Sequence, residues 1–206
     1  MERTELSRTG LHLMRPDVRE ITMAAPTANS ALPTAILRII LGLAWTANAS
    51  LKWFPAFGAA FLPMLTGASQ DQPGFLKPWF NFVTAVASDG RAPFLALGSA
   101  VMETYLAVAL LTGFARKTTY AVGAIYTAVI WATAEGFGGP YVPGVSTDVG
   151  AAIISSLLFL MLLINDAGAG FSRLSLDSVL ERRVPGWRRV AELDWRGPRV
   201  SRAMDR

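Results

Sequence analysis

The chain has 206 residues, of which 52% are hydrophobic and 17% are charged, and its formal net charge is +4. The charged fraction lies below the quarter that is typical of soluble domains, and the mean hydropathy is positive at +0.37. This composition favours an integral membrane protein over a soluble domain with an unusually apolar core. Cysteine is absent, which excludes disulfides, thiol redox chemistry, iron–sulfur clusters and zinc–thiolate sites within the chain. His12 is the only histidine, which excludes a haem held by two protein histidines.

The predicted elements begin after a polar segment, residues 1–30, that is expected to form an N-terminal tail. Four apolar runs follow within a domain of residues 31–170, and each approaches the ~20 residues that a helix needs to cross a bilayer. The runs cover roughly residues 33–54, 93–112, 118–134 and 148–165. The sequence therefore predicts an all-α fold, an integral membrane four-helix bundle with small residues at the helix contacts.

The connection between the first two runs, residues 55–92, is long, apolar in part and broken by prolines. Its apolar pieces are too short to span, so they are predicted to be interfacial or re-entrant segments with Trp79 and Phe80 near the lipid headgroups. Beyond the fourth run, residues 171–206 form a basic tail with nine arginines. Such a tail can bind nucleic acid or lie on anionic lipid. Beside a membrane domain we favour the lipid surface and expect no nucleic-acid binding.

Lysine and arginine are distributed unequally between the two sides of the predicted bundle. Four arginines precede the first run, Arg116 and Lys117 separate the second run from the third, and the nine arginines of the tail follow the fourth. The stretch of residues 131–150, between the third and fourth runs, contains no lysine or arginine. The positive-inside rule therefore predicts a multi-pass protein with both termini in the cytoplasm and residues 131–150 in an extracytoplasmic loop.

Two charged residues, Arg38 and Glu103, fall inside apolar runs. A charge at bilayer depth costs ~2.5–3.5 kcal/mol even on the mildest scale, so such a residue normally faces the bundle interior and has a partner. Arg38 is long enough to reach the cytoplasmic interface instead. Glu103 is too short to do so, and we expect it to be paired, protonated or adjacent to a polar cavity.

Two stripes of residues at helical spacing are predicted to face the bundle interior. The first run contributes Arg38, Gly42, Trp45, Ala49 and Lys52, and the third contributes Tyr120, Ala124, Thr127 and Trp131. An aromatic stripe serves packing more often than ligand binding. Flat aromatic walls, scattered hydrogen-bond donors and a buried acid nevertheless suit a quinone head group, with Arg38, Trp45 and Trp131 as candidate binding residues.

Three further charged residues are predicted to meet at the extracytoplasmic mouth of the bundle: Lys52, Glu135 and Asp148. Lys52 ends the first run on that side, and the two acids flank the glycine-rich stretch of residues 136–145. Asp148 can also cap the fourth helix, and Glu135 can simply be solvated. We predict that Lys52 pairs with one of the two acids, and we take Glu103, Lys52, Glu135 and Asp148 as the candidate catalytic residues.

The chain resembles the DoxX/DoxD family, which includes the small membrane subunit of thiosulfate:quinone oxidoreductase. The matching pieces are "LRIILGLAWTANASLKWF", "METYLAVALLTGFARK", "WATAEGFGGPYVPGVSTDVGAAIISSLLFLMLLI" and "GAGFSRLSLD". Together they cover most of residues 37–177. The resemblance implies a four-helix protein of a bacterial or archaeal plasma membrane that is linked to sulfur or redox metabolism and to quinone. By position, Arg38, Lys52, Glu103 and Arg116 match the recurrent polar positions of the family.

Two functions are compatible with these features. The leading hypothesis is a subunit for quinone-dependent oxidation of a sulfur compound such as thiosulfate, which passes electrons from a redox partner subunit into the quinone pool. The alternative is a membrane anchor that assembles soluble redox or thiol-detoxifying enzymes without chemistry of its own. In both cases the partners are the lipid bilayer and another protein, and association into a homo-oligomer is compatible with either. The absence of internal inverted repeats argues against a small-solute transporter.

Overall fold

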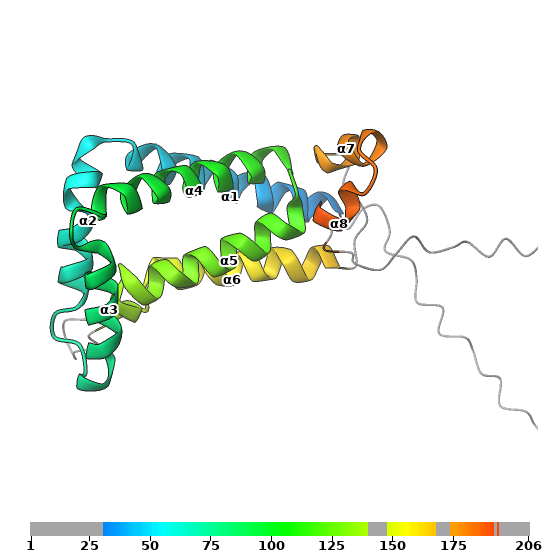
Figure 1. Cartoon of the computed structure of the whole chain (residues 1–206). Helices are drawn as coiled ribbons and strands as arrows, with labels where there is room; N and C mark the ends of the chain where they lie inside the picture. Colours follow the sequence, from blue (N-terminus) through cyan, green and yellow to red (C-terminus); the bar gives the residue numbers. More distant parts are fainter. Residues whose placement is uncertain (1–30, 140–147, 168–173, 192, 194–206) are drawn as a thin grey trace, which may run out of the picture.

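The computed structural model describes residues 31–139, 148–167, 174–191 and 193, and all regular structure within these residues is helical (Figure 1). Four long helices correspond to the four apolar runs: α1 (Ala31–Lys52), α4 (Ala92–Thr112), α5 (Arg116–Thr133) and α6 (Ala151–Ala167). The remaining elements are α2 (Pro55–Ala68), α3 (Lys77–Ala87), α7 (Asp177–Arg183), α8 (Trp187–Ala191) and two 3-10 turns, η2 (Gly74–Leu76) and η3 (Gly136–Gly138). The prediction of an all-α fold is confirmed for the described residues.

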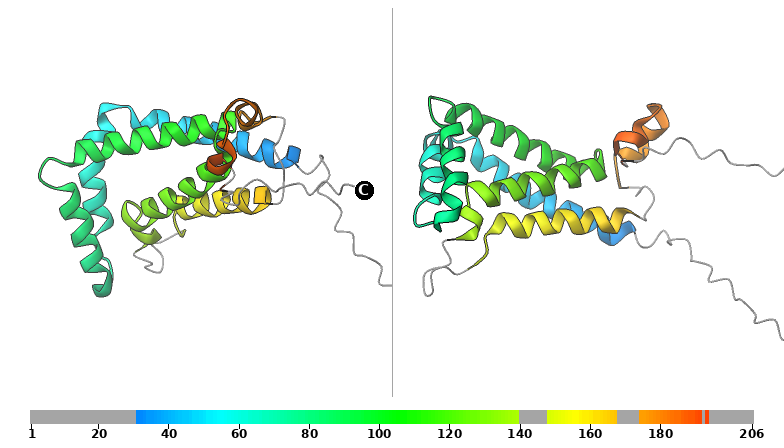
Figure 2. Two further views of the ribbon diagram at one scale, coloured as in Figure 1. Left: turned by 45° about the vertical axis from the view of Figure 1, so that its right-hand side comes forward. Right: turned by 60° about the horizontal axis from the view of Figure 1, so that its bottom comes forward.

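The long helices are arranged as two pairs, with α1 packed along α4 and α5 packed along α6. Figures 1 and 2 show α2 and α3 lying across one end of these pairs and α7 and α8 at the other end. The start of α1, the α4–α5 turn and the end of α6 lie at the α7–α8 end. The four long helices therefore pass from one end to the other in alternating directions.

Two of the described helices are long and apolar enough to cross a bilayer, namely α1 from Leu32 to Lys52 and α4. The α2 and α6 helices are apolar but shorter. α5 begins with Arg116 and Lys117 and contains four threonines, which lowers its hydropathy. These findings support insertion of the chain into a membrane, whereas four spans stay a prediction.

The outer surface of the four long helices is apolar and their inner surface carries charges, the reverse of a water-soluble protein. Among the residues that the structure describes, five charged side chains are buried, namely Arg38, Glu103, Arg116, Asp166 and Asp177. Large apolar side chains are exposed along all four helices, among them Ile40, Leu43, Leu97, Val101, Val108, Ile125, Val129, Ile154, Leu157 and Ile164. Because buried charges require partners while lipid tolerates apolar groups, this distribution suits a bilayer.

The core of each helix pair depends on close approach at glycine. In the α5–α6 pair, a side chain at Gly123 would overlap the ring of Phe159, which is fully buried. In the α1–α4 pair, Gly42 packs against Leu111. The two interior stripes predicted from helical spacing are confirmed: every member is buried except Lys52 and Trp131, which are partly exposed. Small residues thus bring the backbones together, as they do in membrane helix pairs.

A network of buried charges joins α5, α6 and α7 at the α7–α8 end. The Asp177 carboxylate accepts the backbone N–H groups of Ala115 at 2.7 Å and Arg116 at 2.9 Å, and so caps α5. The Arg116 guanidinium lies 3.0 Å from Asp166 and 3.5 Å from Asp177. Arg38 donates to the carbonyl oxygen of Leu174 at 2.7 Å. Part of the segment assigned to the tail, residues 174–191, therefore packs against the α4–α5 turn.

The connection predicted to be interfacial or re-entrant consists of α2 and α3, joined through η2. The two residues of this connection that were predicted to lie near the lipid headgroups, Trp79 and Phe80, differ in environment. Trp79 is partly exposed and donates from its indole nitrogen to the carbonyl oxygen of Ala132 on α5 at 2.7 Å. Phe80 is 1% exposed and packs edge-on against Phe137, so it is a core residue, and its position near the headgroups stays a prediction.

Candidate functional site

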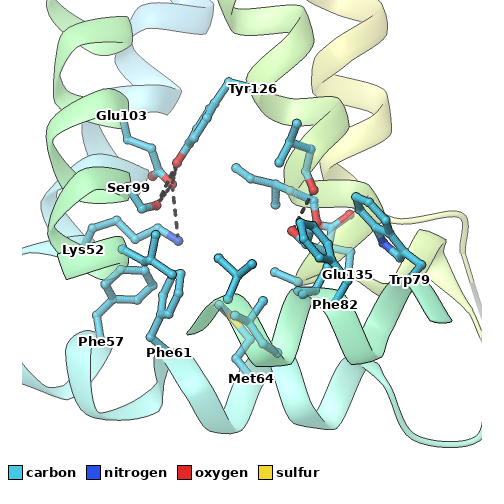
Figure 3. Close-up of a pocket in the computed structure, with 18 residues that line it drawn as sticks. Lys52, Phe57, Phe61, Met64, Trp79, Phe82, Ser99, Glu103, Tyr126 and Glu135 are labelled. Carbon is cyan, nitrogen blue, oxygen red and sulfur yellow. Dashed lines mark hydrogen bonds and ion pairs between the residues drawn. The ribbon is translucent and has the colours of Figure 1, made fainter. Parts of the chain in front are cut away.

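A cavity of about 500 Å³ lies between α4 and α5, on the side of α2 and α3. Its walls come from the start of α4, the second half of α5 and one face each of α2 and α3, while α1 contributes Lys52 and α6 contributes no lining residue. A volume of this size falls in the range of ~300–1,000 Å³ that is typical of small-molecule sites. The lining is mostly apolar, with a few polar groups on its walls (Figure 3).

Glu103 forms the polar base of the cavity and is fully buried. One carboxylate oxygen accepts a hydrogen bond from the Asn48 amide at 2.8 Å. The other accepts from the Tyr126 hydroxyl at 3.2 Å and from the Ser99 hydroxyl at 3.4 Å. The Ser99 and Tyr126 hydroxyl oxygens are themselves 2.7 Å apart. The expectation that Glu103 faces the bundle interior and has polar partners is thus confirmed.

Lys52 supplies the countercharge for Glu103, with its ammonium nitrogen 3.5 Å from the carboxylate. The same ammonium lies 4.5 Å from the centre of the Phe57 ring on α2, close enough for a cation–π contact. The Lys52 side chain is 21% exposed whereas that of Glu103 is fully buried. The lysine therefore links the buried acid to the more accessible part of the cavity.

Aromatic and aliphatic side chains form the walls on either side of this base. The aromatic ones come mainly from α2 and α3, where the chain reverses across the end of the bundle: Phe57, Phe61, Trp79 and Phe82. Tyr126 of α5 adds a ring whose hydroxyl belongs to the Glu103 network. Figure 3 shows Glu103, Ser99, Tyr126 and the Lys52 ammonium gathered at one side of the cavity and Glu135 beside Trp79 and Phe82 at the other.

The predicted pairing of Lys52 with Glu135 or Asp148 is wrong, because the ion pair of Lys52 is with Glu103. Glu135 lines the cavity, but both of its carboxylate oxygens accept the backbone N–H of Ala152, at 2.9 and 3.1 Å. It therefore caps the start of α6, where an acid also interacts favourably with the helix dipole. Asp148 accepts the backbone N–H of Gly150 at 2.8 Å and does not line the cavity.

The three residues proposed to bind quinone are not in this cavity. Arg38 belongs to the charge network at the opposite end of the bundle. Trp45 is 6% exposed and packs against Tyr126 and Phe159 in the main core. Trp131 donates to the carbonyl oxygen of Val149 at 2.8 Å and so ties α5 to the segment before α6. The stripes that contain them are packing surfaces, as aromatic stripes most often are.

Three members of the Glu103 network were not identified from the sequence: Asn48, Ser99 and Tyr126. Ser99 precedes Glu103 by four residues on the same helix, so helical spacing was a signal for it. Asn48 and Tyr126 come from α1 and α5, and only the packing of those helices on α4 brings them to the acid.

Comparison of the chain with protein-family models, curated proteins and solved structures gave no match.

The site can bind a flat, largely apolar molecule that carries hydrogen-bond acceptors. The Lys52 ammonium and the hydroxyl groups of Ser99 and Tyr126 are donors for carbonyl oxygens, and the aromatic side chains offer faces for stacking. The Glu103 carboxylate touches all three donors and is placed to exchange protons with them.

Proposed function

We propose that this chain is an integral membrane protein of the DoxX/DoxD type that binds a quinone in the cavity beside Glu103. In this proposal the chain is a subunit of a system that oxidises a sulfur compound such as thiosulfate and reduces the quinone. The observation that carries the proposal is a cavity of about 500 Å³ with aromatic walls and a fully buried, hydrogen-bonded glutamate at its base. Since the chain has no cysteine and only one histidine, the electrons would come from a partner subunit.

The residues at the base fit the needs of a quinone head group. Reduction of a quinone to a quinol takes two electrons and adds one proton to each carbonyl oxygen. Lys52 and Tyr126 would hold one carbonyl oxygen by donated hydrogen bonds, because their polar atoms meet at Glu103. Glu103 would take up one proton at a time from water on the exposed side of Lys52 and pass it through the Tyr126 or Ser99 hydroxyl, and two successive transfers would supply both protons.

The proposal is tested by extracting quinone from protein purified in mild detergent and by measuring quinone affinity of matched tyrosine variants. Tyr126→Phe removes the hydroxyl at the base of the cavity and keeps the ring, so we expect a loss of about 0.5–1.5 kcal/mol of binding free energy. Tyr105→Phe is the control, because Tyr105 bonds to Thr119 and does not line the cavity. Equal affinity of the two variants, or wild-type protein that contains and binds no quinone, would contradict the proposal and favour a membrane anchor.

A second measurement separates chemistry from stability. Glu103→Gln keeps the size of the side chain but holds no ionisable proton, so quinone-linked turnover should fall more than the yield of folded protein. Glu181→Gln on α7, outside the cavity, is the control for loss of an acid. If Glu103→Gln lowers yield but leaves the turnover of the folded protein unchanged, the role of Glu103 is purely structural.

A further inference from the structure

At the end of the bundle where α2 and α3 lie, these two helices form the wall of the cavity. Leu65 of α2 packs with Val83 and Ala87 of α3 in a small buried core, and Ala134, which directly follows α5, packs against it. Two hydrogen bonds hold this cover in place: Trp79 donates to the carbonyl oxygen of Ala132, and Gln72 donates to that of Gly136 at 3.1 Å. A molecule that came directly from water at this end would have to separate these contacts.

The α4 wall of the cavity changes from exposed to buried along a single row of residues. Leu95, Ser99 and Glu103 are spaced by four and line the cavity together. Leu95 is 38% exposed, Ser99 is partly buried and Glu103 is fully buried. The apolar rim of the cavity therefore lies at Leu95 on this helix, and the polar base lies two turns further along.

The α5 wall has a matching rim at Val129, which lines the cavity and is 52% exposed. Val129 follows Ile125, which is 67% exposed, by four residues, so the two belong to one outward face of α5. On the other side of the rim, Phe82 of α3 also lines the cavity and is exposed. Leu95, Val129 and Phe82 are all apolar, and we call this set the lateral rim.

We propose that the ligand of the cavity is a quinone with a long apolar tail, which enters sideways from the lipid between α4 and α5 and leaves its tail across the lateral rim. This inference rests on the proposed function, and it adds the path by which the quinone enters and the position of its apolar tail. Three observations support it: the covered end, the apolar and exposed rim, and the apolar outer faces of α4 and α5 that would contact lipid. A cavity of about 500 Å³ holds a ring and the start of a chain, so a polyprenyl tail has to lie outside it.

The experiment compares two probes in lipid nanodiscs: a dimethoxy-methyl-benzoquinone without a side chain, and the same ring with a polyprenyl tail. Leu95→Trp and Val129→Trp narrow the lateral rim without changing the polar base. Their controls are Val108→Trp on α4 and Ile125→Trp on α5, which are exposed positions that do not line the cavity. We expect the rim variants to bind the tailed quinone about tenfold more weakly than wild type, a cost of about 1.4 kcal/mol. Their affinity for the tailless ring should stay close to that of wild type.

The outcomes separate the two proposals. If wild type binds both probes and the rim variants behave like their controls, the lateral route is wrong and the quinone site stands. If the rim variants lose both probes equally, the rim holds the ring and the tail does not cross it, which also overturns the inference. If wild type binds neither probe, the proposed function fails, and the inference fails with it.

Discussion

Lys52 and Glu103 form an ion pair at the base of the cavity, and the glutamate of this pair is fully buried. Glu103 is fully buried and its carboxylate has four polar partners, but only Lys52 among them carries charge. An acid of this kind inside an apolar bundle is costly unless a cation compensates it. The pair is therefore needed to keep the base of the cavity polar in an apolar surrounding.

We expect Lys52→Met to lower the free energy of unfolding by about 3 kcal/mol, because removal of one partner leaves an uncompensated buried charge. The double variant Lys52→Met/Glu103→Gln should recover part of this loss, since neither group is then charged. The measurement is unfolding in detergent–SDS mixtures for both single variants and the double variant.

The matched comparison uses Glu135, the acid that sequence analysis assigned to Lys52. Glu135 caps α6 through the Ala152 N–H and does not pair with Lys52. The losses of unfolding free energy caused by Glu135→Gln and by Lys52→Met should therefore add within about 0.5 kcal/mol. Strong coupling of Lys52 to Glu135, together with additivity between Lys52 and Glu103, would contradict the observed pairing.

At the scale of helices, glycine positions distinguish the faces that touch another helix from those that do not. Gly42 and Gly123 lie in the contacts of the two helix pairs, as expected from the small-residue rule. Gly98 is also a small residue within an apolar run, but no atom of another element lies within 4 Å of the position a side chain would take. Composition alone could not distinguish contact positions from exposed positions, because glycine occurs at both.

The difference between these positions predicts that a glycine-to-alanine substitution changes stability differently at Gly123 and at Gly98. Gly123→Ala on α5 would press a methyl group into the Phe159 ring, so we expect a loss of about 1–3 kcal/mol of stability. Gly98→Ala on α4 should be neutral or stabilising by up to about 1 kcal/mol, because it meets open space and alanine favours the helix. Thermal unfolding of both variants in one detergent checks the sign, and equal destabilisation would contradict the assigned faces.

The sequence predicted those features that depend on local spacing or on the cost of burial. Helical periodicity predicted the buried stripe of α1, and the cost of a lone charge predicted that Glu103 has partners. The features that depend on how helices meet were not predicted. Lys52 pairs with Glu103 because α1 packs along α4. Glu135 caps α6 because the end of α5 lies beside the start of α6. The aromatic walls of the cavity were not predicted, because the sequence of α2 and α3 indicated segments at the membrane surface. Only tertiary contacts place the aromatic side chains of these two helices against α4 and α5.

At the scale of the whole molecule, the arrangement of helices gives the basic residues a common end. Arg116 and Lys117 begin α5 next to α7, and four exposed arginines lie on α7 and α8, namely Arg182, Arg183, Arg188 and Arg189. At the opposite end, with α2 and α3, the described basic residues are Lys52, Lys77 and Arg91. If the protein spans a membrane, the positive-inside rule assigns the α7–α8 end to the cytoplasm.

The open question at this scale is the number of spans, because α5 and α6 are less apolar or shorter than α1 and α4. α6 has 17 residues, which is the lower limit of about 17 for a spanning helix. Two-span and four-span models agree that the α3–α4 turn is outside and the C-terminal end is inside. They differ only for the connection between α5 and α6, which is cytoplasmic with two spans and extracytoplasmic with four.

Single-cysteine labelling decides between them, because the native chain has no cysteine. We expect Ser146→Cys, in the connection between α5 and α6, and Asp89→Cys, in the α3–α4 turn, to react with a membrane-impermeant maleimide from outside. Arg183→Cys on α7 should react only after the membrane is opened. α5 and α6 pack along each other and leave large apolar side chains exposed on their outer faces, so four spans keep these faces in lipid, whereas two spans would place them in water. Labelling of Asp89→Cys but not Ser146→Cys from outside would establish two spans and would remove α5, and with it one wall of the cavity, from the bilayer.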